Sequence, residues 1–214
     1  MSLHEIAESK VPLVSDKAWS HDYYRQVYQK VLGGLKDRDF TLLEIGIYHG
    51  YSLGVWREYF NNATIIGVEI DPYNLFPYKP DEGIHYGPLT VIQRWFNTMS
   101  IDTAAFYDNL KDCAIIYGDA TKEKTFKLIG LDTLDVVIDD GSHVLDDIVT
   151  SFNILYPRLA QGGLYIIEDS PEAVEYFVNN ANLEKDPAIE VVDVYDGREI
   201  TKNQYSCAIT LRKR

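Results

Sequence analysis

The chain has 214 residues, 46% of them hydrophobic and 25% charged, which is the balance of an ordinary globular protein. Its formal net charge is −13. An acidic surface repels phosphate backbones, so nucleic-acid binding is not expected. A bound metal ion reverses the potential locally, so an anionic cofactor is not excluded.

The sequence carries no sign of export or of a membrane anchor. Its first residues lack the basic start and apolar stretch of a signal peptide, and no apolar run reaches membrane-spanning length. Cys113 and Cys207 stand in strand-like surroundings without a CxxC spacing, which indicates free thiols in a reducing compartment. We therefore expect a cytoplasmic protein that does not bind membranes.

The predicted elements alternate between helices and strands. After about seventeen polar and irregular residues, helical spacing predicts a helix over 22–32, and Ser52 is expected to cap the next one. Further helices are expected around 122–128, from 145 towards 159, and over 172–180. The apolar runs that predict strands are, in chain order, TLLEIG, ATIIGVEID, CAIIYGD, DVVIDD, GLYIIED, IEVVDVY and YSCAITL.

This alternation predicts an α/β fold, namely a Rossmann-like, doubly wound and mostly parallel sheet of about seven strands. The last two runs flank a turn-like connector and predict a C-terminal antiparallel hairpin. We expect one domain over 1–214. Segment 73–112 is rich in aromatic residues and long for a plain crossover, which favours an insertion or lid. Its rings suit either stacking on an acceptor or an interface in a homo-oligomer.

Two predicted strands end in clusters of carboxylates, in DVVIDDGSH and GGLYIIEDS. Ligands of open α/β sheets bind beyond the carboxyl ends of the strands, so neighbouring strands of this kind would bring these groups together. Magnesium prefers oxygen ligands, and a histidine beside them can accept a proton. Each acid alone would equally fit a turn or a helix cap. The cluster comprises Asp139, Asp140, His143, Glu168 and Asp169.

The turn LLEIGIYHGYS after the first strand predicts a cofactor site. Gly46 and Gly50 permit close approach of a ligand, but Tyr48 stands where the dinucleotide fingerprint has its second glycine. Tyr48 therefore argues against NAD or FAD. Glu69 follows Gly46 by roughly 20 residues, the offset at which an acid holds a ribose. Asp119, after the third strand, would either face an adenine or cap a helix.

Two other histidines lie near these motifs. His49 is inside the glycine turn, where it could line the cofactor pocket. His21 would border the site if the N-terminal segment folds over it. Neither position fixes a role for the side chain.

The order LEIGxxxG, GVEIDP, GDA, DVVIDDGSH and LxxGGLYIIED resembles class I S-adenosylmethionine-dependent methyltransferases. The motifs are more similar still to the metal-dependent sugar O-methyltransferases of macrolide biosynthesis and their cephalosporin hydroxylase-like relatives. The stretch SDKAWSHDYYRQVYQK also resembles that group. The resemblance covers about 16–169, and the acidic strand ends are its specific part.

The resemblance implies a single methyltransferase-like domain that binds S-adenosylmethionine and Mg²⁺. The macrolide enzymes carry a long N-terminal domain without a counterpart here and do not obviously match segment 73–112, so neither their assembly nor their substrate is carried over. By position, the implied cofactor-binding residues are Glu44, Gly46, Gly50, Glu69, Asp119 and Asp139. The implied metal ligands are Asp140, Glu168 and Asp169, with His143 as general base.

We therefore expect an enzyme that methylates a hydroxyl of a small molecule, such as a sugar or a glycosylated natural product, with the help of Mg²⁺. Three alternatives stay open. They are a metal-independent N-methyltransferase that uses His143 or Asp139, a nucleotide-dependent oxidoreductase, and a non-catalytic module that keeps the cofactor pocket.

Overall fold

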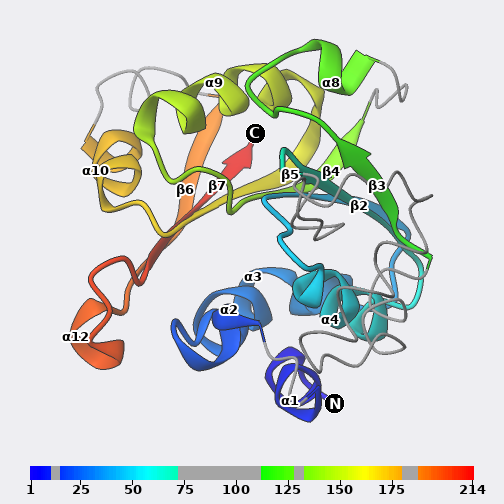
Figure 1. The fold of residues 1–214 in the computed structure, drawn as a ribbon, viewed down its shortest axis with the longest axis vertical. Coiled ribbons are helices and arrows are strands. Elements are labelled where there is room, and N and C mark those ends of the chain that lie inside the picture. The colour runs from blue at the N-terminus through cyan, green and yellow to red at the C-terminus, as the bar shows by residue number, and fades with distance from the viewer. Residues whose placement is uncertain (11–14, 72–111, 128–132, 180–187) are drawn as a thin grey trace, which may run out of the picture.

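The computed structural model describes residues 1–10, 15–71, 112–127, 133–179 and 188–214. Seven strands form one sheet in the order β3-β2-β1-β4-β5-β7-β6, with helices on both faces (Figure 1). The expected Rossmann-like, mostly parallel sheet of seven strands is confirmed. Segment 73–112 lies outside the described residues except for Asp112, so the insertion or lid stays a prediction.

The strands fall into a parallel and an antiparallel part. Strands β1 (Phe40–Ile45), β2 (Ala63–Glu69), β3 (Ala114–Tyr117), β4 (Leu134–Asp139) and β5 (Leu159–Glu168) pair in parallel. β7 (Cys207–Lys213) pairs antiparallel with both β5 and β6 (Ile189–Asp196), which confirms the C-terminal hairpin. All five parallel strands therefore present their carboxyl ends at one edge of the sheet.

Helices cover the two faces in groups that are consecutive in the chain (Figure 1). On one face lie α1 (Leu3–Ser9), α2 (Asp16–Trp19), a π-helical turn (Tyr24–Tyr28) that continues into α3 (Gln29–Leu32), and α4 (Tyr51–Tyr59). On the other lie α8 (Lys124–Lys127), α9 (Leu145–Leu155) and α10 (Pro171–Asn179), and α12 (Arg198–Thr201) is in the β6–β7 connector. No helix in these described ranges is long and apolar enough to cross a membrane.

The sheet separates two hydrophobic clusters. Along β4, Val136 and Ile138 pack into the cluster that contains α1 and α4, whereas Val137 packs into the cluster that contains α9 and α10. Because successive side chains of a strand point to opposite faces, a strand that is covered on both sides must be apolar throughout. This explains why the central strands are continuous apolar runs.

Two local expectations are wrong. Leu3–Ser9, within the segment expected to be irregular, is a helix: Ser2 and Glu5 form a capping box, and Leu3 and Ile6 are buried. That helix has only 7 residues, too few for its periodicity to stand out in the sequence. Ser52 does not cap α4 but lies buried inside it, and the N-cap is Gly50 in a left-handed conformation.

Candidate active site

The acidic ends of β4 and β5 meet, because these two strands are parallel neighbours with Asp139 opposite Ile167. Asp140, His143 and Asp169 each offer a ligand atom, and these atoms lie within 4.8 Å of one another. Glu168 belongs to the same edge, and its Oε2 pairs with Lys17, as Asp140 Oδ2 also does. The structure therefore groups Asp140 and Asp169 with His143, and Lys17 links Glu168 to Asp140.

A cavity of about 380 Å³ opens at this edge of the sheet. A second cavity of about 260 Å³ lies along the glycine turn and shares Gly46, Tyr48 and Asp140 with the first. His49, expected to face a pocket, lines the second cavity. Of the predicted site residues, those that line the first cavity are Gly46, Glu69, Asp119, Asp139, Asp140 and His143.

The glycine turn packs against the backbone that follows β4. Gly46 has a φ of 78°, and a Cβ atom added to it would lie 2.0 Å from the carbonyl oxygen of Asp140. No other residue fits without moving the backbone. Glu69 accepts hydrogen bonds from the backbone N–H of Tyr48 and of Asp71, both at 2.9 Å. The acid at the end of β2 thus fixes the turn and forms part of the cavity wall.

Three residues of this region that are not glycine have left-handed backbones. The φ angles are 48° for Tyr48, 59° for His143 and 57° for Asp169. Such conformations cost roughly 1 kcal/mol each and persist where surrounding contacts impose them. The His143 carbonyl accepts a hydrogen bond from Ser170 Oγ at 3.1 Å, and the Asp169 N–H donates to the Cys207 carbonyl at 3.0 Å. Local strain of this kind is characteristic of functional sites.

Lys17 is buried in the centre of the acidic cluster, and the sequence alone did not single it out. Its Nζ pairs with Asp140 Oδ2 and Glu168 Oε2 and lies 3.4 Å from Glu44 Oε1. Burial lowers the pKa of Lys17, but the surrounding carboxylates outweigh that effect and raise the pKa well above its usual range. The side chain is therefore an ammonium.

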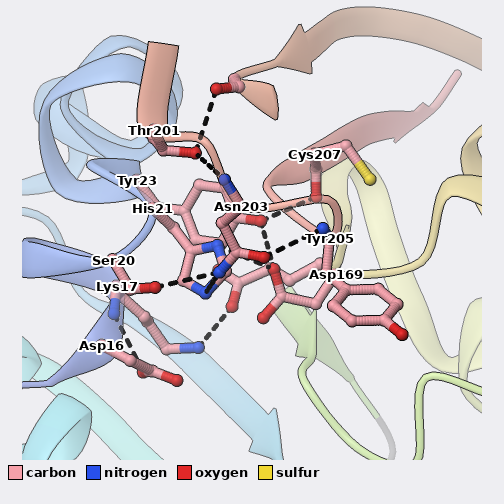
Figure 2. Close-up of polar contacts among 12 residues, drawn as sticks. Asp16, Lys17, Ser20, His21, Tyr23, Asp169, Thr201, Asn203, Tyr205 and Cys207 are labelled. Carbon is pink, nitrogen blue, oxygen red and sulfur yellow. Dashed lines mark hydrogen bonds and ion pairs between the residues drawn. The ribbon is translucent and has the colours of Figure 1, made fainter. Parts of the chain in front are cut away.

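Asp169 is held from the N-terminal side by His21 and Tyr23. His21 Nδ1 lies 3.3 Å from Asp169 Oδ1, and the Tyr23 hydroxyl donates to the same oxygen. Asn203, in the connector between β6 and β7, donates to Ser20 Oγ at 3.0 Å and lies 3.4 Å from His21 Nε2 (Figure 2). The N-terminal segment does fold over this edge of the sheet, and His21, for which the sequence left the position open, lies beside Asp169.

Asp139 and Asp119 have structural partners as well as a place on the cavity wall. Asp139 is buried and accepts hydrogen bonds from Ser151 Oγ at 2.6 Å and the Tyr165 hydroxyl at 3.0 Å. Burial raises the pKa of Asp139.

Asp119 accepts hydrogen bonds from the backbone N–H and the hydroxyl of Thr121, at 2.8 and 2.6 Å. These bonds hold the pKa of Asp119 below its usual value. The position of Asp119 is thus compatible with both hypotheses, a helix cap and a residue that faces the adenine.

Two of the implied cofactor-binding residues lie behind the cavities rather than on their walls, and the implied metal ligands Glu168 and Asp169 line neither cavity. Glu44 is fully buried and accepts a hydrogen bond from Trp56 Nε1 at 2.7 Å. Gly50 begins α4 with a φ of 74°. Neither residue lines a cavity. Glu44 would therefore affect a ligand through Lys17 and Trp56, and Gly50 through the glycine turn.

The donor set at the strand ends fits a hard divalent cation. Glu168 Oε1 is buried and has no hydrogen-bond partner among the residues that the structure describes. One ammonium, on Lys17, faces three carboxylates, so negative charge remains uncompensated. Burial and the nearby Asp169 raise the pKa of Glu168 from its ordinary value of 4.5 to about 8, against the opposing effect of Lys17. Carboxylate oxygens with this excess of negative charge are the ligands that Mg²⁺ prefers.

A protein-family model described as "Methyltransferase domain" matches residues 43–170. A 2'-O-methyltransferase of 8-demethyl-8-alpha-L-rhamnosyl tetracenomycin-C from Streptomyces olivaceus is 32% identical over 164 residues, which cover 72% of this chain and 35% of that protein. L-olivosyl-oleandolide 3-O-methyltransferase from Streptomyces antibioticus is 29% identical over 163 residues, which cover 73% and 34%. The chain thus spans about a third of the length of these curated relatives.

Solved structures show the same fold. MycE methyltransferase from the mycinamycin biosynthetic pathway, in complex with Mg, SAH and mycinamycin VI, superposes with a TM-score of 0.61 at 18% identity, over 100% of this chain and 54% of that one. A putative caffeoyl-CoA O-methyltransferase from Staphylococcus aureus gives a TM-score of 0.53 at 18% identity, over 99% and 90%. At these identities the likeness establishes the fold.

Proposed function

Because the chain belongs to the methyltransferase domain family, we propose that it transfers a methyl group from S-adenosylmethionine to a hydroxyl of a small molecule, such as a sugar or glycosylated natural product. The observation that carries this proposal is the meeting of Asp140, His143 and Asp169 beside a cavity that includes Gly46 and Glu69. The choice of acceptor class is supported by the relatives, a 2'-O-methyltransferase of a rhamnosyl tetracenomycin-C and an L-olivosyl-oleandolide 3-O-methyltransferase.

The glycine turn and the end of β2 would hold the cofactor. S-adenosylmethionine, when bound, supplies a methyl group on a positively charged sulfur, which a correctly placed oxygen can attack. Gly46 leaves room along the turn, and the carboxylate of Glu69 would accept hydrogen bonds from ribose hydroxyls. Asp119 would face the adenine and Asp139 the cofactor side of the β4 end. Glu44 and Gly50 would support this wall from behind.

The ends of β4 and β5 would hold Mg²⁺ through Asp140, Asp169 and the unpaired oxygen of Glu168. Mg²⁺, when bound, lowers the pKa of a hydroxyl ligand and fixes its position. His143 is exposed on the cavity wall, within reach of both aspartates, and would accept the proton of the acceptor hydroxyl. Its position on the same turn as Asp140 keeps base and metal ligands together.

One specific observation favours a second candidate, a methyltransferase that works without metal. The Lys17 ammonium already pairs with Asp140 and Glu168, and it could neutralise the cluster by itself. In that case His143 or Asp139 would deprotonate the acceptor, which could be an amine. The oxidoreductase alternative is not supported by the family to which the chain belongs.

We also propose, from the acidic net charge of −13, that the acceptor is a small molecule and not a nucleic acid. A cytoplasmic location and a homo-oligomer stay predictions from the sequence, as does the role of segment 73–112 as lid or interface.

The proposed reaction can be tested with labelled S-adenosylmethionine and a panel of glycosides and free sugars, in the presence of Mg²⁺ or of EDTA. Label transfer to a glycoside that stops in EDTA and in Asp140→Asn supports the metal-dependent reaction. Asp146→Asn is the matched control, because Asp146 is exposed and lies outside both cavities. Undiminished transfer in EDTA selects the metal-independent candidate, and failure to bind the cofactor at all refutes both.

A further inference from the structure

Lys17 is an unusual residue for the interior of an α/β domain, since it is only 2% exposed. Lysine is buried in proteins almost only when its charge is paired. Here the partners come from three different strand ends, namely Glu44 in β1, Asp140 after β4 and Glu168 in β5. A single side chain from the N-terminal segment therefore ties together the strands that carry the proposed metal site.

Lys17 contacts only some of the carboxylate oxygens among the described residues of the acidic cluster. It occupies one oxygen each of Asp140 and Glu168, while Glu168 Oε1 stays buried and without a partner in the described part of the chain. Asp140 also belongs to the group, with His143 and Asp169, whose ligand atoms lie within 4.8 Å. The ammonium and a divalent cation would thus share the same two carboxylates without needing the same oxygens.

We propose that Lys17 is a positioning residue that acts as an internal counter-ion: it keeps Asp140 and Glu168 in place before the metal binds, and Mg²⁺ partly takes over that role. The inference rests on the proposed function for its metal, but the pairing with the carboxylates is independent of it. Removal of one partner from a buried ion pair leaves an uncompensated charge, and a bound cation can relieve that cost. Lys17 and Mg²⁺ should therefore stabilise the fold in a partly redundant way.

The first experiment compares thermal unfolding of the wild-type chain and of Lys17→Met, which keeps the length of the side chain but removes its charge. In EDTA the midpoint of Lys17→Met should fall by roughly 10 °C. Mg²⁺ should raise the midpoint of the variant by several degrees more than that of the wild type. Lys10→Met is the matched control, because Lys10 pairs with Glu58 at 2.9 Å away from the cluster. Its response to Mg²⁺ should equal that of the wild type.

A double mutant makes the test independent of metal binding. Lys17→Met/Glu168→Gln removes one positive and one negative charge together, so in EDTA it should unfold at a higher temperature than Lys17→Met alone. The comparison also remains decisive if Lys17→Met fails to fold, since the double mutant should then recover folded protein. A double mutant no more stable than the single one overturns the counter-ion role. Equal Mg²⁺ responses of wild type and Lys17→Met overturn the redundancy with metal, whereas a wild type that binds no Mg²⁺ refutes the metal part of the proposed function.

Discussion

Single residues at the strand ends set the conditions under which this site can work. Glu168 is buried, and burial together with the nearby Asp169 raises its pKa to about 8, against the opposing effect of Lys17. A folded-state pKa above the ordinary 4.5 means that its contribution to stability is fully present below about pH 4.5 and is lost as the pH rises through about 8. Binding of Mg²⁺ opposes protonation of Glu168, because the metal binds the ionised carboxylate.

The raised pKa of Glu168 predicts how the affinity for Mg²⁺ depends on pH. The affinity for Mg²⁺ should rise with pH, by up to about tenfold per pH unit below pH 8, and level off above it. Isothermal titration of Mg²⁺ from about pH 6 to about pH 9 measures the slope. Glu168→Gln should flatten it, and a wild-type affinity independent of pH over this range would contradict the assignment.

The backbone of Gly46 provides a second test at the scale of one residue. Gly46→Ala places a methyl group against the Asp140 carbonyl in a left-handed conformation, so it should cost about 2–3 kcal/mol of unfolding free energy and weaken cofactor binding more than tenfold. Urea unfolding and titration with S-adenosylhomocysteine measure both effects. Gly34→Ala is the control, because a Cβ atom there meets nothing within 4 Å. If Gly46→Ala and Gly34→Ala have the same unfolding free energy and the same affinity for S-adenosylhomocysteine, the backbone at Gly46 can move without loss of stability or binding.

At the scale of elements, the site depends on contacts that join helices to strand ends. α9 fixes the end of β4 through the hydrogen bond from Ser151 to Asp139, and Tyr165 of β5 donates to the same carboxylate oxygen. The three elements therefore share one buried acceptor. A buried carboxylate that loses a donor keeps its desolvation cost without compensation.

This shared acceptor predicts that Ser151→Ala destabilises the protein by about 1–3 kcal/mol. The expected loss can be measured by urea unfolding. Thr150→Ala is the control, because the neighbouring hydroxyl is exposed and bonds within its own helix, to the Asp146 carbonyl at 2.7 Å. If Ser151→Ala proves as stable as Thr150→Ala, the bond to Asp139 does not support the strand end.

The strands were predictable from the sequence, whereas the contacts of Lys17 were not. All seven strands were predictable: burial on both faces makes the central strands continuous apolar runs, and the last two strands flank a turn-like connector. The role of Lys17 was not, since its partners Asp140 and Glu168 lie 123 and 151 residues further along the chain. Only the resemblance of the SDKAWSHDYYRQVYQK stretch pointed to that segment, without saying which side chains enter the site.

For the whole molecule, sheet order explains how the acidic motifs become one site. Because β1 lies between β2 and β4, and β4 beside β5, the glycine turn, Glu69 and the two acidic strand ends share one edge. This convergence was predictable from the alternation of strands and helices together with the rule that ligands bind at carboxyl ends. The N-terminal segment closes the same edge from outside, through contacts that depend on the complete fold and have no local signature.

Titration of Mg²⁺ into the chain saturated with S-adenosylhomocysteine tests the central claim most directly. The wild type should bind one Mg²⁺ per chain, and Asp140→Asn should lose at least about a hundredfold in affinity, while Asp146→Asn should bind as the wild type does. No binding by the wild type, or equal affinity of Asp140→Asn, would contradict a metal-dependent methyltransferase site at the ends of β4 and β5.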